Sequence, residues 1–349
     1  MLKIGPIQLD TPFTQAALAG YSDLPMRRIA RRYGAAYALN EVVLDKLVNQ
    51  RGKKRNEILG VAGDDHPIGG QLMGAEPDDF APAASAMAEA GYDVIDLNFA
   101  CPVKKVLGRG RGGHMLSQPD RALEVIRRVR DAVGATHPVT VKMRRGLDNT
   151  EQSRRRFFEI LDGAFETGIA AVTVHGRTVK QRYIGPSDWS FLEEVKRRVG
   201  DGVIIGSGDL FSAEACMRIM RETGVDGVAI ARGGIGNPWI FRECVALWRG
   251  RRLPAPPSIE EQRLAISTHW EGAVDFYGDR LAAKIMRKFG IKYSEHHPRS
   301  PEVRDAFIAV KTAAGFADVL DKWYDPTKSW PAVRRRRDHG DLIAAGAAE

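Results

Sequence analysis

The feature that most constrains the fold is a repeated alternation of short β-rich segments with longer amphipathic segments over about the first 250 residues. Strands that alternate with helices build a parallel sheet with crossover helices. Eight similar units favour a closed (β/α)8 barrel of the TIM type over a doubly wound sheet. We therefore predict an α/β barrel with strands at 13–20, 36–41, 68–73, 94–98, 139–143, 171–175, 203–206 and 227–231.

The amphipathic segments between these strands carry the signals of helices. Several follow an Asp or Ser that can cap a helix, and several end at a glycine, as at Gly34, Gly91 and Gly168. We predict helices at 24–33, 78–90, 119–133, 153–167, 192–199, 213–223 and 239–248.

The barrel pattern stops at a proline cluster, Pro254, Pro256 and Pro257. Beyond it, only helical patterns follow, and a chain of 349 residues has room for a barrel of about 250 residues and a small second domain. We predict a barrel at 1–250, a small all-helical C-terminal domain at 255–330, and a basic, flexible tail at 331–349 that contains four consecutive arginines from Arg334.

Composition narrows the class of protein. The formal net charge of +8 favours a polyanionic partner. The three cysteines, Cys101, Cys216 and Cys244, have no paired spacing, which argues against a disulfide framework or a metal site and fits a reducing compartment. No apolar run is long enough for a membrane helix and the start lacks a signal-peptide pattern, so we expect a cytoplasmic protein without a membrane partner.

Polar residues interrupt the apolar pattern at the ends of the predicted strands, where barrel enzymes keep their reactive groups. Any one of them, taken singly, is more often a solvated strand end or a capped loop. Together they predict a functional site. They are Glu41, Gln71, Asn98, Cys101, Lys142, Arg144, His175, Arg177, Ser207, Gly208, Asp209, Arg232 and Gly233.

The last two units predict a phosphate site. Residues 206–209 and 232–234 place small residues and backbone N–H groups where barrels commonly bind phosphate. Lys142 and His175 would face the body of the ligand, and an ammonium there would stabilise the negative charge of a reduced isoalloxazine. FMN fits this arrangement. The glycine-rich segment 108–113 follows no strand directly, so we reject a dinucleotide fingerprint there.

The segment 96–102, Asp-Leu-Asn-Phe-Ala-Cys-Pro, followed by Lys104 and Lys105, resembles the signature loop of the tRNA-dihydrouridine synthases. Further matches are 19–20, 71, 142–144, 175–178 and 237–241, so the resemblance covers most of residues 10–250. It continues more weakly at 276–278 and 287–288, and the bacterial B-type branch is the most similar.

This resemblance implies reduction of the C5=C6 bond of a uridine in RNA, namely tRNA, to dihydrouridine, with FMN as cofactor and NADPH as reductant. It implies that Asn98, Arg144 and Arg177 bind the uracil and that Lys104, Lys105, Arg287 and Lys288 bind RNA. The implied FMN contacts are Ala17, Leu18, Gln71, Lys142, His175, Ser207, Gly208, Asp209, Ala231, Arg232 and Gly233.

The chain departs from the family pattern at several of these positions. Ala17 and Leu18 replace the usual Pro and Met, and Ala100 replaces the Gly before the cysteine. Ser207 replaces an Asn and Ala231 a Gly in the phosphate loops, while Phe289 and Lys292 replace a His and a Trp in the helical domain. We expect these changes to affect substrate choice and flavin affinity more than the reaction.

The reaction itself requires one proton donor. Hydride delivered to C6 of uracil leaves enolate-like charge that is quenched by a proton at C5. Cys101 fits this role, because an unperturbed thiol titrates near pH 8.5 and is mostly protonated at neutral pH, and Lys104, Lys105 and Arg109 lie nearby in the sequence. The alternative is a buried structural cysteine.

Two other readings remain open. One is an FMN barrel enzyme for a small molecule, of the dihydroorotate or dihydropyrimidine dehydrogenase or ene-reductase type, which would need neither the helical domain nor the basic loop at Cys101. The other is a noncatalytic RNA-binding barrel that has lost tight flavin binding through Ser207 and Ala231. We expect a monomer, and the sequence leaves the modified position and the choice between tRNA and ribosomal RNA open.

Overall fold

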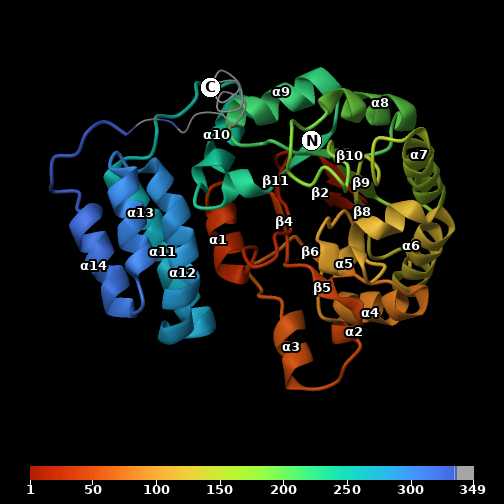
Figure 1. Ribbon diagram of the computed structural model, residues 1–349, viewed down its shortest axis with the longest axis horizontal. Coiled ribbons are helices and arrows are strands. Elements are labelled where there is room, and N and C mark those ends of the chain that lie inside the picture. Colours follow the sequence, from red (N-terminus) through yellow and green to blue (C-terminus); the bar gives the residue numbers. More distant parts are fainter. Residues whose placement is uncertain (334, 336–349) are drawn as a thin grey trace.

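The computed structural model describes residues 1–333 and 335. Eight parallel strands form a closed barrel, each paired with its neighbours in chain order, and the ring closes through β11–β3 and β4–β6 pairings (Figure 1). The predicted (β/α)8 barrel is confirmed. Its strands are β3 (Phe13–Gln15), β4 (Tyr37–Leu39), β6 (Ile68–Met73), β7 (Val94–Phe99), β8 (Val139–Arg144), β9 (Ala171–His175), β10 (Ile204–Ser207) and β11 (Gly227–Ile230).

Seven helices follow the strands in the predicted places and surround the barrel (Figure 1). They are α1 (Leu24–Arg32), α4 (Pro77–Glu89), α6 (Pro119–Val133), α7 (Glu151–Glu166), α8 (Trp189–Val199), α9 (Ala213–Thr223) and α10 (Trp239–Trp248). The second unit differs, because β4 leads into β5 (Val43–Leu44), α2 (Asp45–Val48) and α3 (Lys53–Leu59) instead of one long helix. The eight units are therefore not equal.

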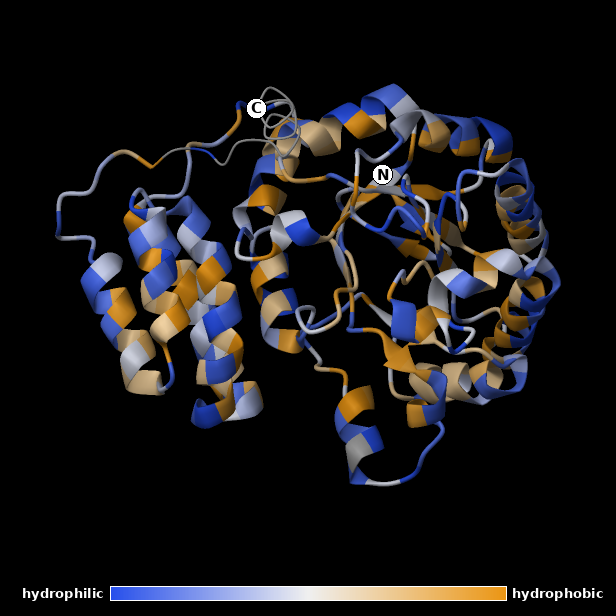
Figure 2. Ribbon diagram, viewed as in Figure 1, coloured by the Kyte–Doolittle hydropathy of each residue, from blue (hydrophilic) through white to orange (hydrophobic). Residues whose placement is uncertain are grey.

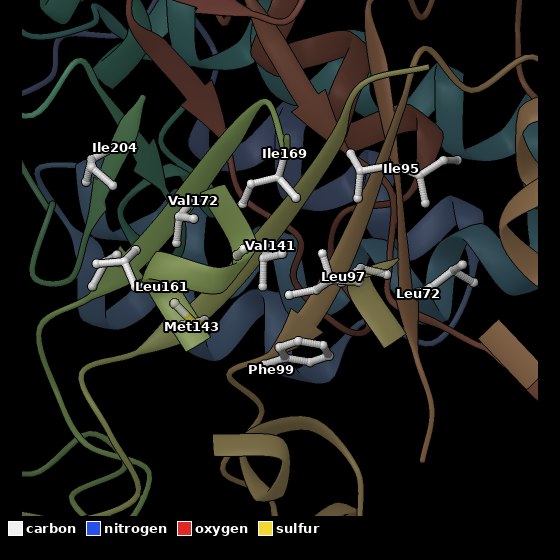
Figure 3. Packing of buried hydrophobic residues seen from close by; sticks show 14 of the residues in the cluster. Leu72, Ile95, Leu97, Phe99, Val141, Met143, Leu161, Ile169, Val172 and Ile204 are labelled. Carbon is white, nitrogen blue, oxygen red and sulfur yellow. The ribbon is translucent and has the colours of Figure 1, made fainter. Parts of the chain in front are cut away.

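Alternation along each strand separates two layers of side chains. On β7, Ile95, Leu97 and Phe99 point outward and pack with apolar residues of the neighbouring strands and of α7 (Figure 3). The intervening Asp96 and Asn98 point into the barrel. Figure 2 shows the complementary pattern on the surrounding helices, which carry hydrophilic residues on their outer faces.

The end of the barrel where the strands begin, called the base below, is closed by the N-terminal segment. The hairpin of β1 (Lys3–Ile4) and β2 (Ile7–Gln8) brings Leu2, Ile4 and Leu9 against apolar side chains inside the barrel. The opposite end, where the strands finish, is called the mouth below. Because the base is filled with apolar side chains, polar chemistry inside the barrel is confined to the mouth.

Four helices form the C-terminal region beside α1 and α10 (Figure 1): α11 (Ile259–Tyr277), α12 (Asp279–Tyr293), α13 (Ser300–Ala309) and α14 (Ala313–Trp323). Their core is continuous with the barrel, since Met26 of α1 and Trp239 of α10 pack within it. The Tyr277 hydroxyl also donates to the Asp23 carboxylate at 3.0 Å. The helical region is therefore joined to the barrel by a shared apolar core.

Residues between α10 and α11 form neither helix nor strand, and α11 begins with a Ser258–Glu261 capping box. At the other end of this region, Arg335 Nη1 lies 2.6 Å from a Glu243 carboxylate oxygen on α10, and Val333 packs on the helical core. Residues 334 and 336–349, which make up most of the predicted tail, lie outside the described residues. None of the described helices has the length and apolar character that a membrane span requires.

Candidate active site

The polar residues predicted from strand ends meet at the mouth. Strand register pairs Asn98 with Lys142, Arg144 with His175, and His175 with Ser207, so these side chains alternate inward on four neighbouring strands. Gln71 joins them from β6, where it pairs with Asp96. The polar residues that the sequence places at the strand ends thus form one contiguous polar surface.

A line of hydrogen bonds runs through this surface to Cys101. The Gln71 amide donates from Nε2 to the Asp96 carboxylate at 2.7 Å and accepts at Oε1 from Asn98 Nδ2, also at 2.7 Å. Asn98 Oδ1 then accepts the backbone N–H groups of Ala100 and Cys101, both at 3.0 Å. Asn98 and Gln71 were predicted to bind ligands, but their amide groups are used to hold the cysteine loop in place.

Cys101 is half-buried just beyond the end of β7. Its carbonyl accepts the Gly113 N–H at 3.1 Å, and a Cβ on Gly112 would lie 2.8 Å from the Cys101 Cβ. Gly112 also has a φ of +58°, which favours glycine. The glycine-rich segment therefore packs directly against the cysteine, through the loop that contains α5 (Lys104–Leu107) and the 3-10 helix η1 (Gly112–Ser117).

Lys142 and Asp96 form the charged floor of the mouth. Burial and the Arg144 guanidinium lower the pKa of the Lys142 ammonium to about 8, although Asp96 opposes this shift. Burial raises the pKa of the Asp96 carboxyl to about 6, against hydrogen bonds from Thr140 and Gln71. Lys142 makes no hydrogen bond or ion pair with any described residue, and the charge that attracts it is that of Asp96. Its ammonium is thus available to a ligand.

The Arg144 side chain connects two loops of the mouth. Its Nε donates to the Ala100 carbonyl at 3.0 Å, and its Nη1 donates to the carbonyls of Thr178 and Arg182 at 2.9 and 2.7 Å. Burial lowers the pKa of this guanidinium to about 10, so it stays charged at neutral pH. Arg144 therefore ties the cysteine loop to the loop after β9, which the sequence did not indicate.

His175 presents a neutral ring to the mouth. Its Nδ1 accepts the Arg177 N–H at 3.1 Å, which places the ring proton on Nε2. Burial, with the nearby cations Lys142, Arg144, Arg177 and Arg232, lowers the pKa of the imidazole well below its usual range. His175 can consequently donate one hydrogen bond to a ligand without carrying charge.

The predicted phosphate loops lie beside each other after β10 and β11, where η2 (Arg232–Gly234) begins. The backbone N–H groups of Gly208, Asp209, Arg232 and Gly233 donate to no acceptor in the described chain. Asp209 Oδ2 instead accepts from Arg177 Nη2 and from the Ser187 N–H, each at 2.7 Å. Asp209 therefore organises the loop, and its N–H rather than its carboxylate is free for a phosphate.

Arg177 does not reach the position predicted for it. Its side chain is 2% exposed, and it donates to the Gly185 carbonyl and to Asp209. The expected contact of Arg177 with uracil stays a prediction. One of its terminal nitrogens, Nη1, and the Ser187 hydroxyl are buried without a partner beside the phosphate loop.

These observations fit a flavin mononucleotide. Unpaired backbone N–H groups and the buried, unpaired Arg177 Nη1 and Ser187 Oγ surround one end of the mouth, where a phosphate supplies acceptors. Lys142 and the His175 Nε2–H lie on neighbouring strands, where a flavin ring would need a cation and a donor. Ala17 and Leu18 follow β3 at the same end of the barrel and are half-buried. The described residues include no cluster of three or more His, Cys, Asp or Glu that could bind a metal.

The predicted RNA-contact residues fall into two groups. Lys104 and Lys105 are exposed on α5, next to the Cys101 loop, and Arg287 is exposed on α12. Lys288 is not exposed in this way. Its ammonium donates to the Gly20 carbonyl and lies 4.7 Å from the ring centroid of Tyr21, so it connects α12 to the loop after β3. The predicted contact of Lys288 with RNA stays a prediction.

Sequence reasoning missed two residues of the site. Asp96 was seen only as part of the signature loop, although it lies beneath Lys142 and orients Gln71. Tyr183, in the loop after β9, is 56% exposed, and the guanidiniums of Arg144 and Arg232 lie 5.6 and 4.6 Å from its ring centroid. An aromatic residue within a basic, glycine-containing loop at a strand end was the available signal for Tyr183.

Comparisons with known proteins agree with this geometry. The model of the family "Dihydrouridine synthase (Dus)" matches residues 14–327. A "Probable tRNA-dihydrouridine synthase" of Rickettsia conorii is 33% identical over 93% of this chain and 96% of the relative. The "tRNA-dihydrouridine synthase B" of Xanthomonas campestris pv. campestris is also 33% identical, with the same coverage of both chains.

Solved structures share the barrel at low sequence identity. A 2-naphthoyl-CoA reductase superimposes with a TM-score of 0.57 at 12% identity, covering 72% of this chain and 52% of the other. Morphinone reductase superimposes with a TM-score of 0.51 at 15% identity, covering 80% of this chain and 95% of the other. These likenesses concern the fold, whereas the family match extends through the signature loop, the mouth and the helical region. The chain belongs to the dihydrouridine synthase family.

Proposed function

We propose that this chain reduces the C5=C6 bond of a uridine in tRNA to 5,6-dihydrouridine, with bound FMN and with NADPH as reductant. The observation that carries the proposal is that Cys101 and Lys142 lie at the same mouth. The backbone N–H of Cys101 donates to Asn98, and Asn98 pairs in register with Lys142, whose ammonium is unpaired. This supplies a proton donor next to a cation that suits a reduced flavin. Membership of the dihydrouridine synthase family supports the same reaction.

The residues that would hold FMN are those at the mouth with free donors. The N–H groups of Gly208, Asp209, Arg232 and Gly233 would bind its phosphate, Ser207, Ala231, Ala17 and Leu18 would border it, and Lys142 and His175 would face its ring. Reduced FMN supplies a hydride for C6 of the uracil. The Lys142 ammonium stabilises negative charge there, and the neutral His175 donates one hydrogen bond without adding charge.

Cys101 is proposed as the acid. When C6 receives the hydride, negative charge extends over C5 and the C4 carbonyl of the uracil, and the Cys101 thiol delivers its proton to C5. Asn98 and Arg144 hold the Cys101 loop at its N–H groups and at the Ala100 carbonyl. Arg144 Nη2 makes no hydrogen bond with a described residue and is proposed to bind a uracil carbonyl.

The RNA substrate is proposed to approach across the mouth and α12. A stacked uridine must leave its stack to enter the mouth, and the exposed Tyr183 ring offers it a surface there. Around the mouth, Lys104 and Lys105 are exposed on α5, and Arg280, Lys284 and Arg287 are exposed on α12 without ion pairs to described residues. We assign residues 1–250 to the catalytic barrel and 255–330 to RNA docking, in a monomer that acts in the cytoplasm.

The first test is the absorbance spectrum of the purified protein, followed by NADPH-driven dihydrouridine formation on tRNA that lacks this modification. A flavin spectrum together with product establishes the activity. A flavin spectrum without dihydrouridine formation on tRNA contradicts the proposal that tRNA is the substrate. Absence of flavin even after FMN is added would overturn the catalytic proposal as a whole.

Cys101→Ala separates the proposed acid from the flavin site. We expect the variant to keep the flavin spectrum and NADPH oxidation by oxygen, because the phosphate loops and Lys142 are unchanged. Dihydrouridine formation should fall by about 100-fold or more, the usual contribution of a general acid. Unchanged product formation would exclude Cys101 as the proton donor.

A further inference from the structure

A second concentration of positive charge lies at the base of the barrel, at the end opposite the mouth. There, the C-terminal ends of α1 and α10 border a pocket of about 570 Å³, together with the chain that enters β3 and β4. Apart from Asp10, every charged side chain in its lining is an arginine: Arg31, Arg32, Arg242, Arg249, Arg251 and Arg252.

Among the described residues, two of these arginines have an ion-pair partner. Arg31 pairs with Asp65 at 2.9 Å, and Arg242 pairs with Glu261 at 2.5 Å. The remaining four, Arg32, Arg249, Arg251 and Arg252, form no ion pair or side-chain hydrogen bond within the part of the chain that the structure describes. Four unpaired guanidiniums thus share one pocket with a single carboxylate.

The helix dipole explains the positions of only some of these arginines. A cation at a helix C-terminus interacts favourably with the helix dipole, which accounts for Arg32 at the end of α1 and Arg249 just after α10. Arg251 and Arg252 lie beyond the last turn and receive no such benefit. All four side chains are exposed, and because like charges in a shared concave site repel each other, a bound anion would balance them.

The pocket wall also holds donors that have no acceptor. The Thr11 hydroxyl is buried and makes no hydrogen bond, although Thr11 is only 3% exposed and lines the pocket. Arg242 likewise leaves its Nε–H unpaired, since its ion pair uses Nη1. Buried donors normally have acceptors, and a group with only acceptor oxygens would satisfy both.

We propose that this pocket binds an oligophosphate, that is, two or more linked phosphate groups. Guanidinium groups match phosphate oxygens in bidentate geometry, and four of them exceed what a single orthophosphate can engage. The volume also exceeds that of one phosphate. The site is distinct from the flavin site because it lies at the other end of a barrel whose interior is filled by Leu2, Ile4 and Leu9.

The linked phosphates have two sources, a free polyphosphate anion or the backbone of RNA. RNA as the source rests on the proposed function, whereas a free polyphosphate anion does not. The connection between α10 and α11 carries Arg251 and Arg252, so an RNA that lies along the helical region would meet the same guanidiniums. Both sources share the chemistry that the pocket recognises.

The test is calorimetric titration of the flavin-loaded, full-length protein with sodium tripolyphosphate at low salt. The variant is Arg249→Gln with Arg252→Gln, and the matched control is Arg155→Gln with Arg156→Gln on α7, which removes the same charge elsewhere. We expect the pocket variant to lose at least tenfold in affinity and the control to stay within about twofold of wild type. Equal binding by the two variants would overturn the proposal, and this readout does not depend on dihydrouridine formation.

Salt dependence of tRNA binding then identifies the source. If RNA phosphates occupy the pocket, the pocket variant should reduce the slope of log affinity against log salt by about 1.4 to 1.8, because each of the two lost phosphate contacts removes about 0.7 to 0.9. If the slope equals that of the control while tripolyphosphate binding is lost, the ligand is a free polyphosphate. Thermal unfolding and the flavin spectrum of each variant confirm that it is folded.

Discussion

Asp96 and Cys101 are connected by an unbroken line of hydrogen bonds that passes through two amide side chains. The carboxylate accepts from Gln71, Gln71 accepts from Asn98, and Asn98 accepts the Cys101 N–H. An amide can point either way, and both ends of the line fix its direction. Asp96 accepts but does not donate, and the backbone N–H groups of Ala100 and Cys101 donate but do not accept. The Asp96 carboxylate and the Cys101 loop therefore require the same orientation of the Asn98 amide, which holds the proposed acid.

Asp96→Asn should disturb this line. An asparagine offers one acceptor and one donor to Thr140 and Gln71, both of which donate to the carboxylate in the wild type. Gln71 therefore exchanges a charge-assisted hydrogen bond for a neutral one or loses it. We expect turnover on unmodified tRNA to fall by about tenfold, the equivalent of one lost hydrogen bond of about 1.4 kcal/mol, while the flavin spectrum persists.

Thr140→Val is the matched control for this prediction. It removes the hydrogen bond from Thr140 to Asp96 but leaves the one from Gln71. Its turnover should therefore stay within about threefold of wild type. If Thr140→Val and Asp96→Asn are equally slow, the effect belongs to the hydrogen bond between Thr140 and Asp96, which both variants alter, and not to the bond between Gln71 and Asp96.

The pKa of Lys142, lowered to about 8, predicts opposite pH effects on activity and stability. The ammonium is charged below about pH 8 and loses its proton above it, so flavin reduction by NADPH should slow as the pH rises beyond 8. A bound anion can only raise this pKa, which moves the decline upward. Lys142→Met should remove this pH dependence, as measured by stopped-flow reduction between pH 7 and 10.

For stability the sign is reversed. The folded pKa of Lys142 lies below its ordinary value of 10.5, so the folded flavin-free protein binds fewer protons than the unfolded chain between these values. Wild-type stability should therefore rise relative to Lys142→Met as the pH increases from about 8 to about 10. A difference in melting temperature that stays constant across this window would contradict the lowered pKa.

Much of the fold was predictable because it depends on local periodicity. All eight strands and seven helices were anticipated, since buried parallel strands and amphipathic helices have distinct repeats. The second unit was not anticipated, because α2 and α3 are too short to show the amphipathic repeat by which a helix is recognised in a sequence.

The roles of individual site residues were less predictable. Arg177 and Lys288 stand at positions that suggest ligand binding, yet Arg177 is bound by Gly185 and Asp209, and Lys288 by Gly20. Whether a cation is free depends on acceptors contributed by distant segments, since Lys288 and Gly20 are 268 positions apart. Sequence patterns place a side chain at the mouth but do not reveal which partners have already engaged it.

Gly112→Ala tests whether the glycine-rich segment positions Cys101. The alanine would adopt a φ of +58° and place its Cβ 2.8 Å from the Cys101 Cβ. Gly134→Ala is the control, with a similar φ of +66° but no atom within 4 Å of the added Cβ. Both variants should be destabilised by about 1 kcal/mol for the left-handed conformation.

Only Gly112→Ala should also displace Cys101, so it should lower dihydrouridine formation by about tenfold or more while Gly134→Ala keeps wild-type turnover. Melting temperature and turnover are measured on the same preparations. If the two variants are equally active, the contact between Gly112 and Cys101 does not matter for catalysis.

The exposed ring of Tyr183 gives the last prediction. Its position over the mouth, with the Arg144 and Arg232 guanidiniums 5.6 and 4.6 Å from the ring centroid, suits it to stack against a uridine that has left its helix. Such stacking contributes about 1 to 3 kcal/mol per base. Tyr183→Ala should therefore lower kcat/KM for tRNA by about fivefold to 150-fold, whereas Tyr183→Phe retains the ring and should remain within about twofold of wild type. NADPH oxidation by oxygen involves no RNA and should be equal in all three proteins. If Tyr183→Phe is as slow as Tyr183→Ala, the hydroxyl rather than the ring face makes the contact, and stacking is excluded.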